Sequence, residues 1–182
     1  MIIGLTGSIS GGKGVVAEFL KEKGFSYFSL SNEVREEAKL KGIEFVREKL
    51  QDLGNELREK EGLGVLAKRV IKKINSEENI VIDGIRNPAE ILELRKLPGF
   101  ILISVDAPQK IRFERISKRA RESDPRTWSE FLKVDNRDKG EGEKNSGQQV
   151  GKCMEIADEK LINDSSLEDL REKIEQLFEK LR

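Results

Sequence analysis

Short runs of apolar residues alternate along the chain with longer stretches in which apolar positions recur every three or four residues. The short runs predict buried strands at residues 2–5, 25–30, 79–83, 100–105 and 161–162. The helical stretches between them predict helices on both faces of a parallel sheet, because parallel strands need crossover connections. The pattern therefore predicts an α/β fold with three layers and a five-stranded parallel sheet.

Helical spacing dominates the region from residue 31 to about residue 75. Breaks are expected where glycine weakens a helix, near Gly42, Gly54, Gly62 and Gly64. Another helix is expected to begin at Pro88, because proline suits the first helical turn. Apolar positions at Ile111, Phe113 and Ile116 predict one more helix after the fourth strand.

The C-terminal stretch predicts a final helix. Ser165 and Glu168 have the spacing of a capping box, so the helix is expected to begin at Ser165. Its apolar stripe is expected to pack on the core and consists of Leu167, Leu170, Ile174, Leu177 and Leu181.

The segment from about residue 119 to residue 147 is rich in arginine and glycine and poor in apolar residues. This composition is typical of a mobile segment that could close over an anionic ligand, and plain disorder is the alternative. Trp128, Phe131 and Leu132 favour a helix inside it.

The overall composition narrows the class of protein. A length of 182 residues suits one domain over residues 1–182. Lys and Arg together number 34, as do Asp and Glu, and this zero net charge counts against a nucleic-acid binder. No apolar stretch is long enough to span a membrane, and a single cysteine, Cys153, fits a reduced, cytoplasmic setting. The absence of histidine excludes mechanisms that need an imidazole base or ligand.

Residues 7–13 read Gly-Ser-Ile-Ser-Gly-Gly-Lys, directly after the first predicted strand and directly before the first predicted helix. Glycines let backbone N–H groups wrap a phosphate, and the N-terminus of the helix adds its dipole. Lys13 can reach the β- and γ-phosphates of a nucleotide. The sequence therefore predicts a phosphate loop that binds ATP through Gly7, Ser8, Ile9, Ser10, Gly11, Gly12, Lys13, Gly14 and Val15.

The loop departs from the full phosphate-loop motif after Lys13. The motif ends in Ser or Thr, whose hydroxyl binds Mg²⁺, whereas this chain has Gly14 and Val15. Either metal binding is weak, or phosphates, waters and a carboxylate from a neighbouring strand hold the ion. Asp83, which ends the third predicted strand, is the candidate ligand through water, and the alternative is an aspartate that only caps the turn at Gly84.

The chain resembles the nucleoside monophosphate kinases, and it is also similar to dephospho-coenzyme A kinases and to kinase-like domains of uncertain substrate. Residues 7–14 are similar to the loop of adenylate kinases, which have Thr at the position of Val15. Residues 31–38 resemble the acceptor-side helix of that family. Residues 81–87 resemble its Asp-Gly-x-x-Arg strand end, with one residue fewer before the arginine. Residues 115–119 resemble its lid helix.

The resemblance implies a P-loop NTPase fold in which Lys13, Asp83 and Arg119 act in catalysis. Arg35 and Arg86 would hold the phosphate of the acceptor, because a guanidinium fork binds two oxygens at once. The lid would contribute further arginines, at Arg115, Arg121 and Arg137. For each of these arginines the alternative is a solvated surface residue.

Together these features predict a kinase that uses ATP and Mg²⁺ to phosphorylate a nucleoside monophosphate or a similar small phosphorylated acceptor. Two alternatives remain open. A dephospho-coenzyme A kinase would use Asp83 as a base toward a ribose hydroxyl. A nucleotide-binding sensor with little turnover would fit the missing hydroxyl in the loop.

Overall fold

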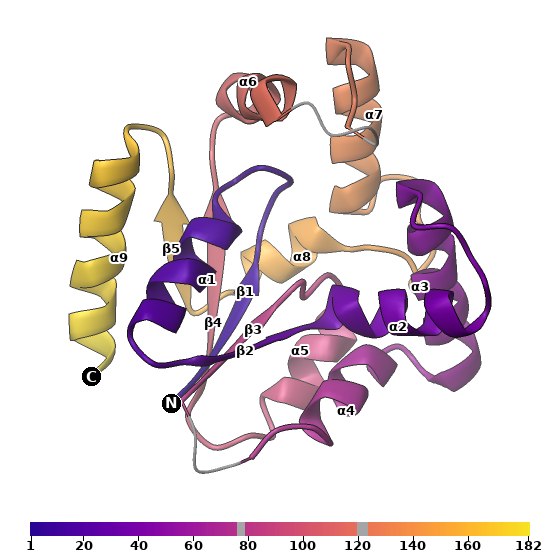
Figure 1. The fold of residues 1–182 in the computed structure, drawn as a ribbon, viewed down its shortest axis with the longest axis horizontal. Helices are drawn as coiled ribbons and strands as arrows, with labels where there is room; N and C mark the ends of the chain where they lie inside the picture. Colours follow the sequence, from indigo (N-terminus) through magenta and orange to yellow (C-terminus); the bar gives the residue numbers. More distant parts are fainter. Residues whose placement is uncertain (76–78, 120–123) are drawn as a thin grey trace.

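The computed structural model describes residues 1–75, 79–119 and 124–182, and within these ranges five parallel strands form one sheet in the order β2-β3-β1-β4-β5 (Figure 1). The strands are β1 (Ile2–Thr6), β2 (Ser26–Ser29), β3 (Ile80–Asp83), β4 (Phe100–Asp106) and β5 (Glu159–Ile162). The central strand β1 pairs with β3 on one side and with β4 on the other. The predicted α/β fold and its five-stranded parallel sheet are confirmed.

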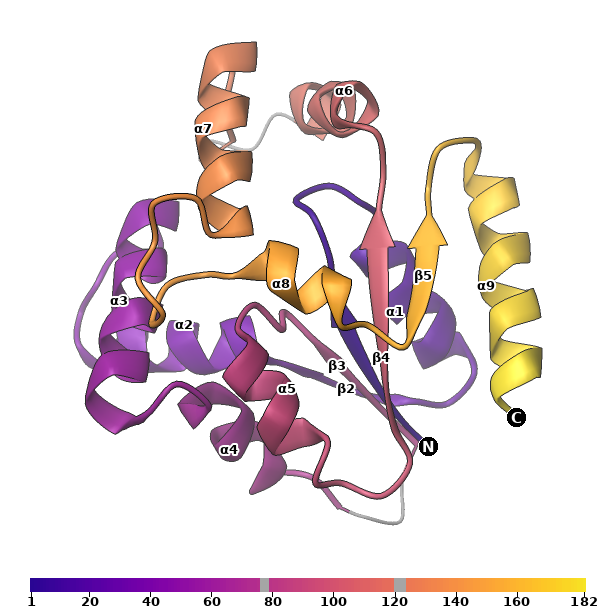
Figure 2. The same ribbon diagram turned by 180° about the vertical axis from the view of Figure 1, so that it is seen from behind.

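Successive residues of the strands point into two separate cores, because side chains alternate across a sheet. Ile3, Leu5 and Val81 face α1 (Lys13–Glu22) and α9 (Leu167–Leu181). Ile80 and Ile82 face the opposite core. That core is covered by α2 (Leu30–Leu40), α3 (Arg47–Glu61), α4 (Val65–Ile71), α5 (Pro88–Leu94) and α8 (Val150–Glu155), and Figure 2 shows α4, α5 and α8 in front of the strands.

Two further helices, α6 (Gln109–Arg119) and α7 (Trp128–Lys139), lie beyond the carboxyl end of β4 (Figures 1 and 2). A small apolar cluster joins them to the loop after β1: Ile9, Ile116 and Phe131 are buried together. The helix predicted around Trp128, Phe131 and Leu132 is therefore present.

Only some of the helix breaks predicted at glycines between residues 31 and 75 are present in the structure. Gly42 and Gly62 lie outside helices, but Gly54 lies inside α3, so the break expected there is wrong. A side-chain carbon built at Gly54 would lie 3.6 Å from Val34 of α2, which is an ordinary packing distance, so the helix tolerates this glycine but does not require it. Pro88 does begin α5, where Asn87 and Glu90 form a capping box.

The last helix begins one position later than predicted. Ser166, not Ser165, is the N-cap, and its hydroxyl accepts a hydrogen bond from the N–H of Asp169 at 3.1 Å. The predicted apolar stripe is wrong at Leu167, which is 52% exposed, and it omitted Phe178, which packs against Phe19 and Phe25. Phe178 lies four positions after Ile174, on the face that α9 buries.

Cys153 lies on α8 and is fully buried in the core that covers β3. Burial raises the pKa of its thiol to about 12, so the side chain packs as a small apolar group. Within residues 1–75, 79–119 and 124–182, no helix is both long and apolar enough to cross a membrane.

The N-cap assignment can be tested by comparing two neighbouring serines. Ser166→Ala should lower the free energy of unfolding by about 1 kcal/mol, because it leaves the N–H of Asp169 without its acceptor. Ser165→Ala should stay within about 0.5 kcal/mol of the parent, and chemical denaturation measures both. Equal effects of the two substitutions would contradict the assignment.

Candidate functional site

The phosphate loop connects β1 to α1 and is shaped by glycine. Gly7 and Gly12 have φ angles of 137° and 118°, which L side chains rarely adopt. A side-chain carbon at Gly7 would lie 2.0 Å from the carbonyl oxygen of Val105 in β4, so only glycine fits at this approach. Ser10, with φ of 55°, is the non-glycine residue that takes a left-handed conformation at the tip of the loop. The loop is therefore curled with Gly7 and Gly11 against Val105 of β4 and Gly12 against Asn163.

Lys13 begins α1 and folds back toward the loop. Its Nζ donates hydrogen bonds to the carbonyl oxygens of Gly7 at 2.7 Å and Ser8 at 3.0 Å. Burial lowers the pKa of the Lys13 ammonium to about 8, and the nearby carboxylate of Asp83 offsets this effect only in part. Two neutral carbonyls are modest partners for a cation, so a phosphate could compete for the ammonium.

A cavity of about 610 Å³ opens beside the loop, at the carboxyl ends of β1 and β3. Its lining includes loop residues 7 and 9–15 together with Asp83. It also includes several of the arginines named from the sequence, which are Arg35, Arg86, Arg115 and Arg119. The structure thus brings the donor-side and acceptor-side candidates together around one cavity.

Asp83 ends β3, directly beside β1 in the sheet. One carboxylate oxygen accepts the N–H of Gly84 at 2.6 Å, and the other accepts the hydroxyl of Tyr27 at 3.3 Å. The turn-capping contact considered as an alternative is therefore present. The carboxylate also lines the cavity, so capping the turn and facing the ligand space are compatible.

The two predicted acceptor arginines are held differently. Arg86 donates to Oε1 of Gln148 at 3.2 Å, and its guanidinium lies 3.7 Å from the carboxylate of Asp138. Arg35 is more exposed and donates to Asn32, a neighbour on α2, at 3.2 Å. Arg86 is therefore fixed by long-range contacts, whereas Arg35 is fixed only locally.

Sequence reasoning missed Arg47, the first residue of α3, which also lines the cavity. Its Nη2 donates to Asp138 at 2.8 Å, but its buried Nε has no hydrogen-bond partner among the described residues. No local motif marks this arginine, because its partner lies 91 positions further along the chain.

The predicted lid arginines separate in the structure. Arg115 donates to Oδ1 of Asn163 at 2.9 Å, and Asn163 in turn donates to the carbonyl of Gly11 in the loop. Arg119 pairs with Asp124 at the cavity edge. Arg137 is not among the residues that line the cavity, and it pairs with Glu143 at 2.7 Å. Arg121 lies outside the described residues.

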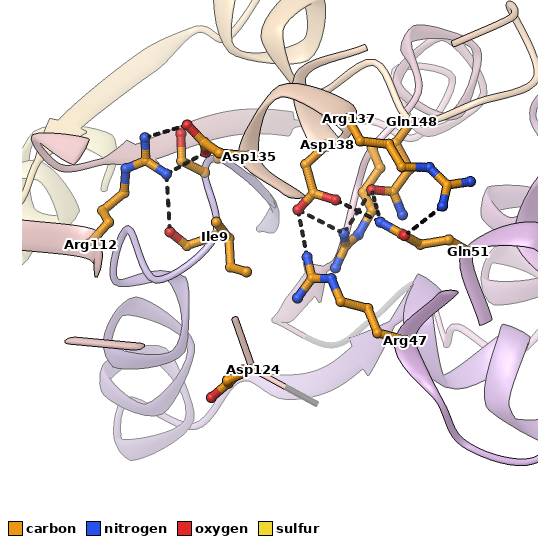
Figure 3. A network of polar contacts seen from close by, with 12 residues as sticks. Ile9, Arg47, Gln51, Arg112, Asp124, Asp135, Arg137, Asp138 and Gln148 are labelled. Atoms are coloured by element: carbon orange, nitrogen blue, oxygen red, sulfur yellow. Dashed lines mark hydrogen bonds and ion pairs between the residues drawn. The ribbon is translucent and has the colours of Figure 1, made fainter. Parts of the chain in front are cut away.

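Helix α7 is tied to the phosphate loop by a buried ion pair. Arg112 of α6 and Asp135 of α7 are each about 1% exposed, and the guanidinium of Arg112 also donates to the carbonyl of Ile9 at 3.4 Å. Figure 3 shows this group beside a second one, in which Asp138 lies among Arg47, Gln51 and Gln148. One helix therefore contacts both the loop and the opposite wall of the cavity.

Comparison with known sequences identifies relatives of this chain. A family model described as an AAA domain matches residues 3–144. The UPF0200 protein PH1008 of Pyrococcus horikoshii is 35% identical over 188 residues, which cover 100% of this chain and 97% of the relative. The chain belongs to the UPF0200 family. A second UPF0200 protein, from Sulfurisphaera tokodaii, is 36% identical over 180 residues, covering 99% of this chain and 97% of that protein.

Solved structures show the same fold in kinases. Shikimate kinase from Acinetobacter baumannii, in complex with shikimate, has a TM-score of 0.60 at 18% identity, covering 98% of this chain and 93% of that one. At this identity the likeness supports the fold alone. The resemblance to P-loop kinase-like proteins of uncertain substrate is thereby confirmed for this UPF0200 chain.

The donor atoms around the UPF0200 loop decide how a metal would fit. Within the described ranges, no group of three or more Asp, Glu, His or Cys side chains is arranged so that it could hold a metal ion. Asp83 is the carboxylate at the end of the strand next to the loop, and its oxygens keep lone pairs beyond their two hydrogen bonds. This sparse donor set fits a hydrated Mg²⁺ held chiefly by nucleotide phosphates.

If the loop binds ATP as predicted, the lowered pKa of Lys13 should make that binding depend on pH. Phosphates favour the charged ammonium, so affinity should be greatest below about pH 8 and should fall by up to about tenfold per unit above it. Isothermal titration of ATP between about pH 7 and pH 9.5 measures this slope. Lys13→Arg, which keeps its charge throughout, should show a shallower slope. A constant affinity of the parent across this range would contradict the expected titration.

Proposed function

We propose that this protein transfers the γ-phosphoryl group of ATP to a nucleoside monophosphate, deoxy or ribo, or to a similar small phosphorylated acceptor. The observation that carries the proposal is the shared cavity. The phosphate loop and Lys13 line it on the donor side, and Arg35 and Arg86 line it on the acceptor side. Phosphoryl transfer needs positioning and charge neutralisation more than acid–base groups, which suits a chain without histidine.

On the donor side, the loop amides of residues 7–15 and the N-terminus of α1 would hold the ATP phosphates. Lys13 would leave the carbonyls of Gly7 and Ser8 and contact the β- and γ-phosphates. Mg²⁺, when bound, supplies positive charge between these phosphates, and Asp83 would hold it through water. Val15 offers no hydroxyl ligand, so the protein contributes few direct metal contacts.

On the acceptor side, an anionic oxygen of the acceptor phosphate attacks the γ-phosphorus. The bond between that phosphorus and the bridging oxygen breaks, and ADP leaves with the electron pair. No proton must be removed from the acceptor, because its phosphate oxygen is already ionised. Arg86 and Arg35 would fix that phosphate. Arg119 would leave its ion pair with Asp124 and stabilise the negative charge on the transferring phosphoryl group.

The lid proposed over residues 119–147 would keep water out of the site, so that hydrolysis does not compete with transfer. Arg115, on α6 just before this segment, is the best placed of the proposed lid arginines, because it contacts Asn163 beside the loop and keeps a buried Nη1 without a hydrogen-bond partner in the described part of the chain. Arg137 would act indirectly, by fixing Glu143.

Two other functions are each favoured by one observation. Gly14 and Val15 offer no metal-binding hydroxyl, which favours a nucleotide sensor with little turnover. Asp83 lines the cavity, which favours a kinase that removes a proton from a hydroxyl acceptor such as the ribose of dephospho-coenzyme A.

A panel of acceptors tests the proposal. The protein is incubated with ATP, Mg²⁺ and single nucleoside monophosphates or dephospho-coenzyme A, and ADP formation is measured with Lys13→Ala as the control. Lys13→Ala should lose both turnover and ATP binding while keeping its fold, because among the described residues the ammonium donates its hydrogen bonds to two loop carbonyls. Phosphorylation of dephospho-coenzyme A alone would favour the hydroxyl acceptor, and ATP binding without turnover would favour the sensor.

The role of Arg86 can be separated from donor binding. Arg86→Ala should reduce kcat/KM for the acceptor by at least about tenfold with little change in ATP affinity, because a bidentate phosphate contact is lost. Arg95→Ala is a matched control, since Arg95 pairs with Asp158 away from the cavity lining. An equal loss toward donor and acceptor would remove Arg86 from the acceptor site.

A further inference from the structure

Helix α7 presents two buried carboxylates, Asp135 and Asp138, three positions apart and therefore on neighbouring parts of one helix face. Asp135 pairs with Arg112 on the side of the phosphate loop. Asp138 points instead into the group formed by Arg47, Gln51 and Gln148 (Figure 3). Asp135 thus supports the phosphate loop through Arg112, whereas Asp138 itself lines the cavity, and the function proposed above uses neither.

The contacts of Asp138 are those of a bound anion. One oxygen accepts from Nη2 of Arg47 at 2.8 Å, and the other accepts from Nε2 of Gln51 at 2.9 Å. The guanidinium of Arg86 lies 3.7 Å away. Both arginines and Asp138 itself line the cavity, so this carboxylate occupies the place where an acceptor anion would meet the same two arginines.

Among the described residues, the carboxylate of Asp138 leaves one of the hydrogen-bond donors around it without an acceptor. The buried Nε of Arg47 has no hydrogen-bond partner within the described ranges. A planar carboxylate offers two oxygens, whereas the phosphate of a monoester offers three terminal oxygens and a charge near −2. A phosphate could therefore meet donors that Asp138 leaves unmet.

We propose that Asp138 is an internal competitor for the acceptor subsite and restricts that subsite to acceptors with a doubly charged phosphate. The proposal deepens the function proposed above and rests on it for the identity of the subsite. A tethered carboxylate competes at a high effective concentration, so a singly charged carboxylate ligand gains little by replacing it. A phosphate dianion gains charge and hydrogen bonds in the exchange.

Displacement of Asp138 need not release the rest of α7. Asp135 remains bound to Arg112, and Phe131 remains in the cluster with Ile9 and Ile116. Asp138 lies in the last turn of the helix, which ends at Gly140 with φ of 105°. The exchange is therefore confined to the end of the helix that faces the acceptor wall.

Anion binding to single variants tests the proposal without requiring turnover. Inorganic phosphate and acetate at about pH 8, where phosphate is mainly a dianion, are titrated calorimetrically into the parent and Asp138→Asn. The parent should bind phosphate at least about tenfold more tightly than acetate. Asp138→Asn should bind both anions more tightly and lower this preference by about tenfold, because the internal competitor is gone.

Three further variants make the result specific. Asp52→Asn removes the same charge from an exposed partner of Arg137 outside the cavity lining and should leave the preference unchanged. The double variant Arg47→Gln, Asp138→Asn should lose the gain in anion affinity expected of Asp138→Asn. That loss would show that the anion binds at this subsite and not at the phosphate loop. Asp138→Ser replaces Asp138→Asn if the latter does not fold.

The outcomes separate this inference from the proposed function. Equal binding of phosphate and acetate by the parent overturns the inference, as does weaker phosphate binding in a folded Asp138 variant, which would make Asp138 a positioning residue for Arg47. If the expected anion pattern appears but no nucleoside monophosphate is phosphorylated, the proposed function fails and the phosphate subsite stands. If transfer occurs and the preference is unchanged in Asp138→Asn, the inference alone fails.

Discussion

The ion pair between Arg112 and Asp135 ties the phosphate loop to the helix that borders the cavity. Removing two charges from water costs several kcal/mol per ion, and only good geometry and further hydrogen bonds offset that cost. Here Arg112 also donates to the carbonyls of Ala107 and Ile9, and Asp135 also accepts from Gln109 at 3.0 Å. Burial alone would raise the pKa of Asp135, but its hydrogen bonds lower it to about 2. The pair therefore stays charged well below neutral pH, and removal of one member would strand the other.

Local signals in the sequence were sufficient for the scaffold. The five strands and the loop before Lys13 follow from apolar runs and glycine spacing, which act over a few residues. The wall opposite the loop could not be predicted in the same way. Arg47 meets Asp138 across 91 positions, and Gln51 meets Gln148 across 97, so no window of sequence contains either pair. Charged residues are abundant in this chain, and only the fold shows which of them face the cavity.

The start of α9 and the glycine inside α3 also show what local sequence signals do not determine. Ser165 and Ser166 are both plausible caps, and in the structure it is the hydroxyl of Ser166 that accepts from the N–H of Asp169. At Gly54 the sequence showed a weak helix former, but α3 continues through it, and the neighbouring Leu53 and Leu57 are buried in the core. Helix propensity is a weak guide at such positions, because the burial of neighbouring apolar residues can outweigh the cost of one glycine.

The burial of Cys153 gives the chain a practical property. Its thiol is sealed beneath α8 with a pKa of about 12, and it is the only cysteine in the sequence. Thiol reagents need the thiolate, so the native protein should give almost no labelling background near neutral pH. Cysteines introduced at exposed positions on α3 and α7 could then carry a pair of spectroscopic labels, and their separation would report directly on the width of the cavity as ligands enter.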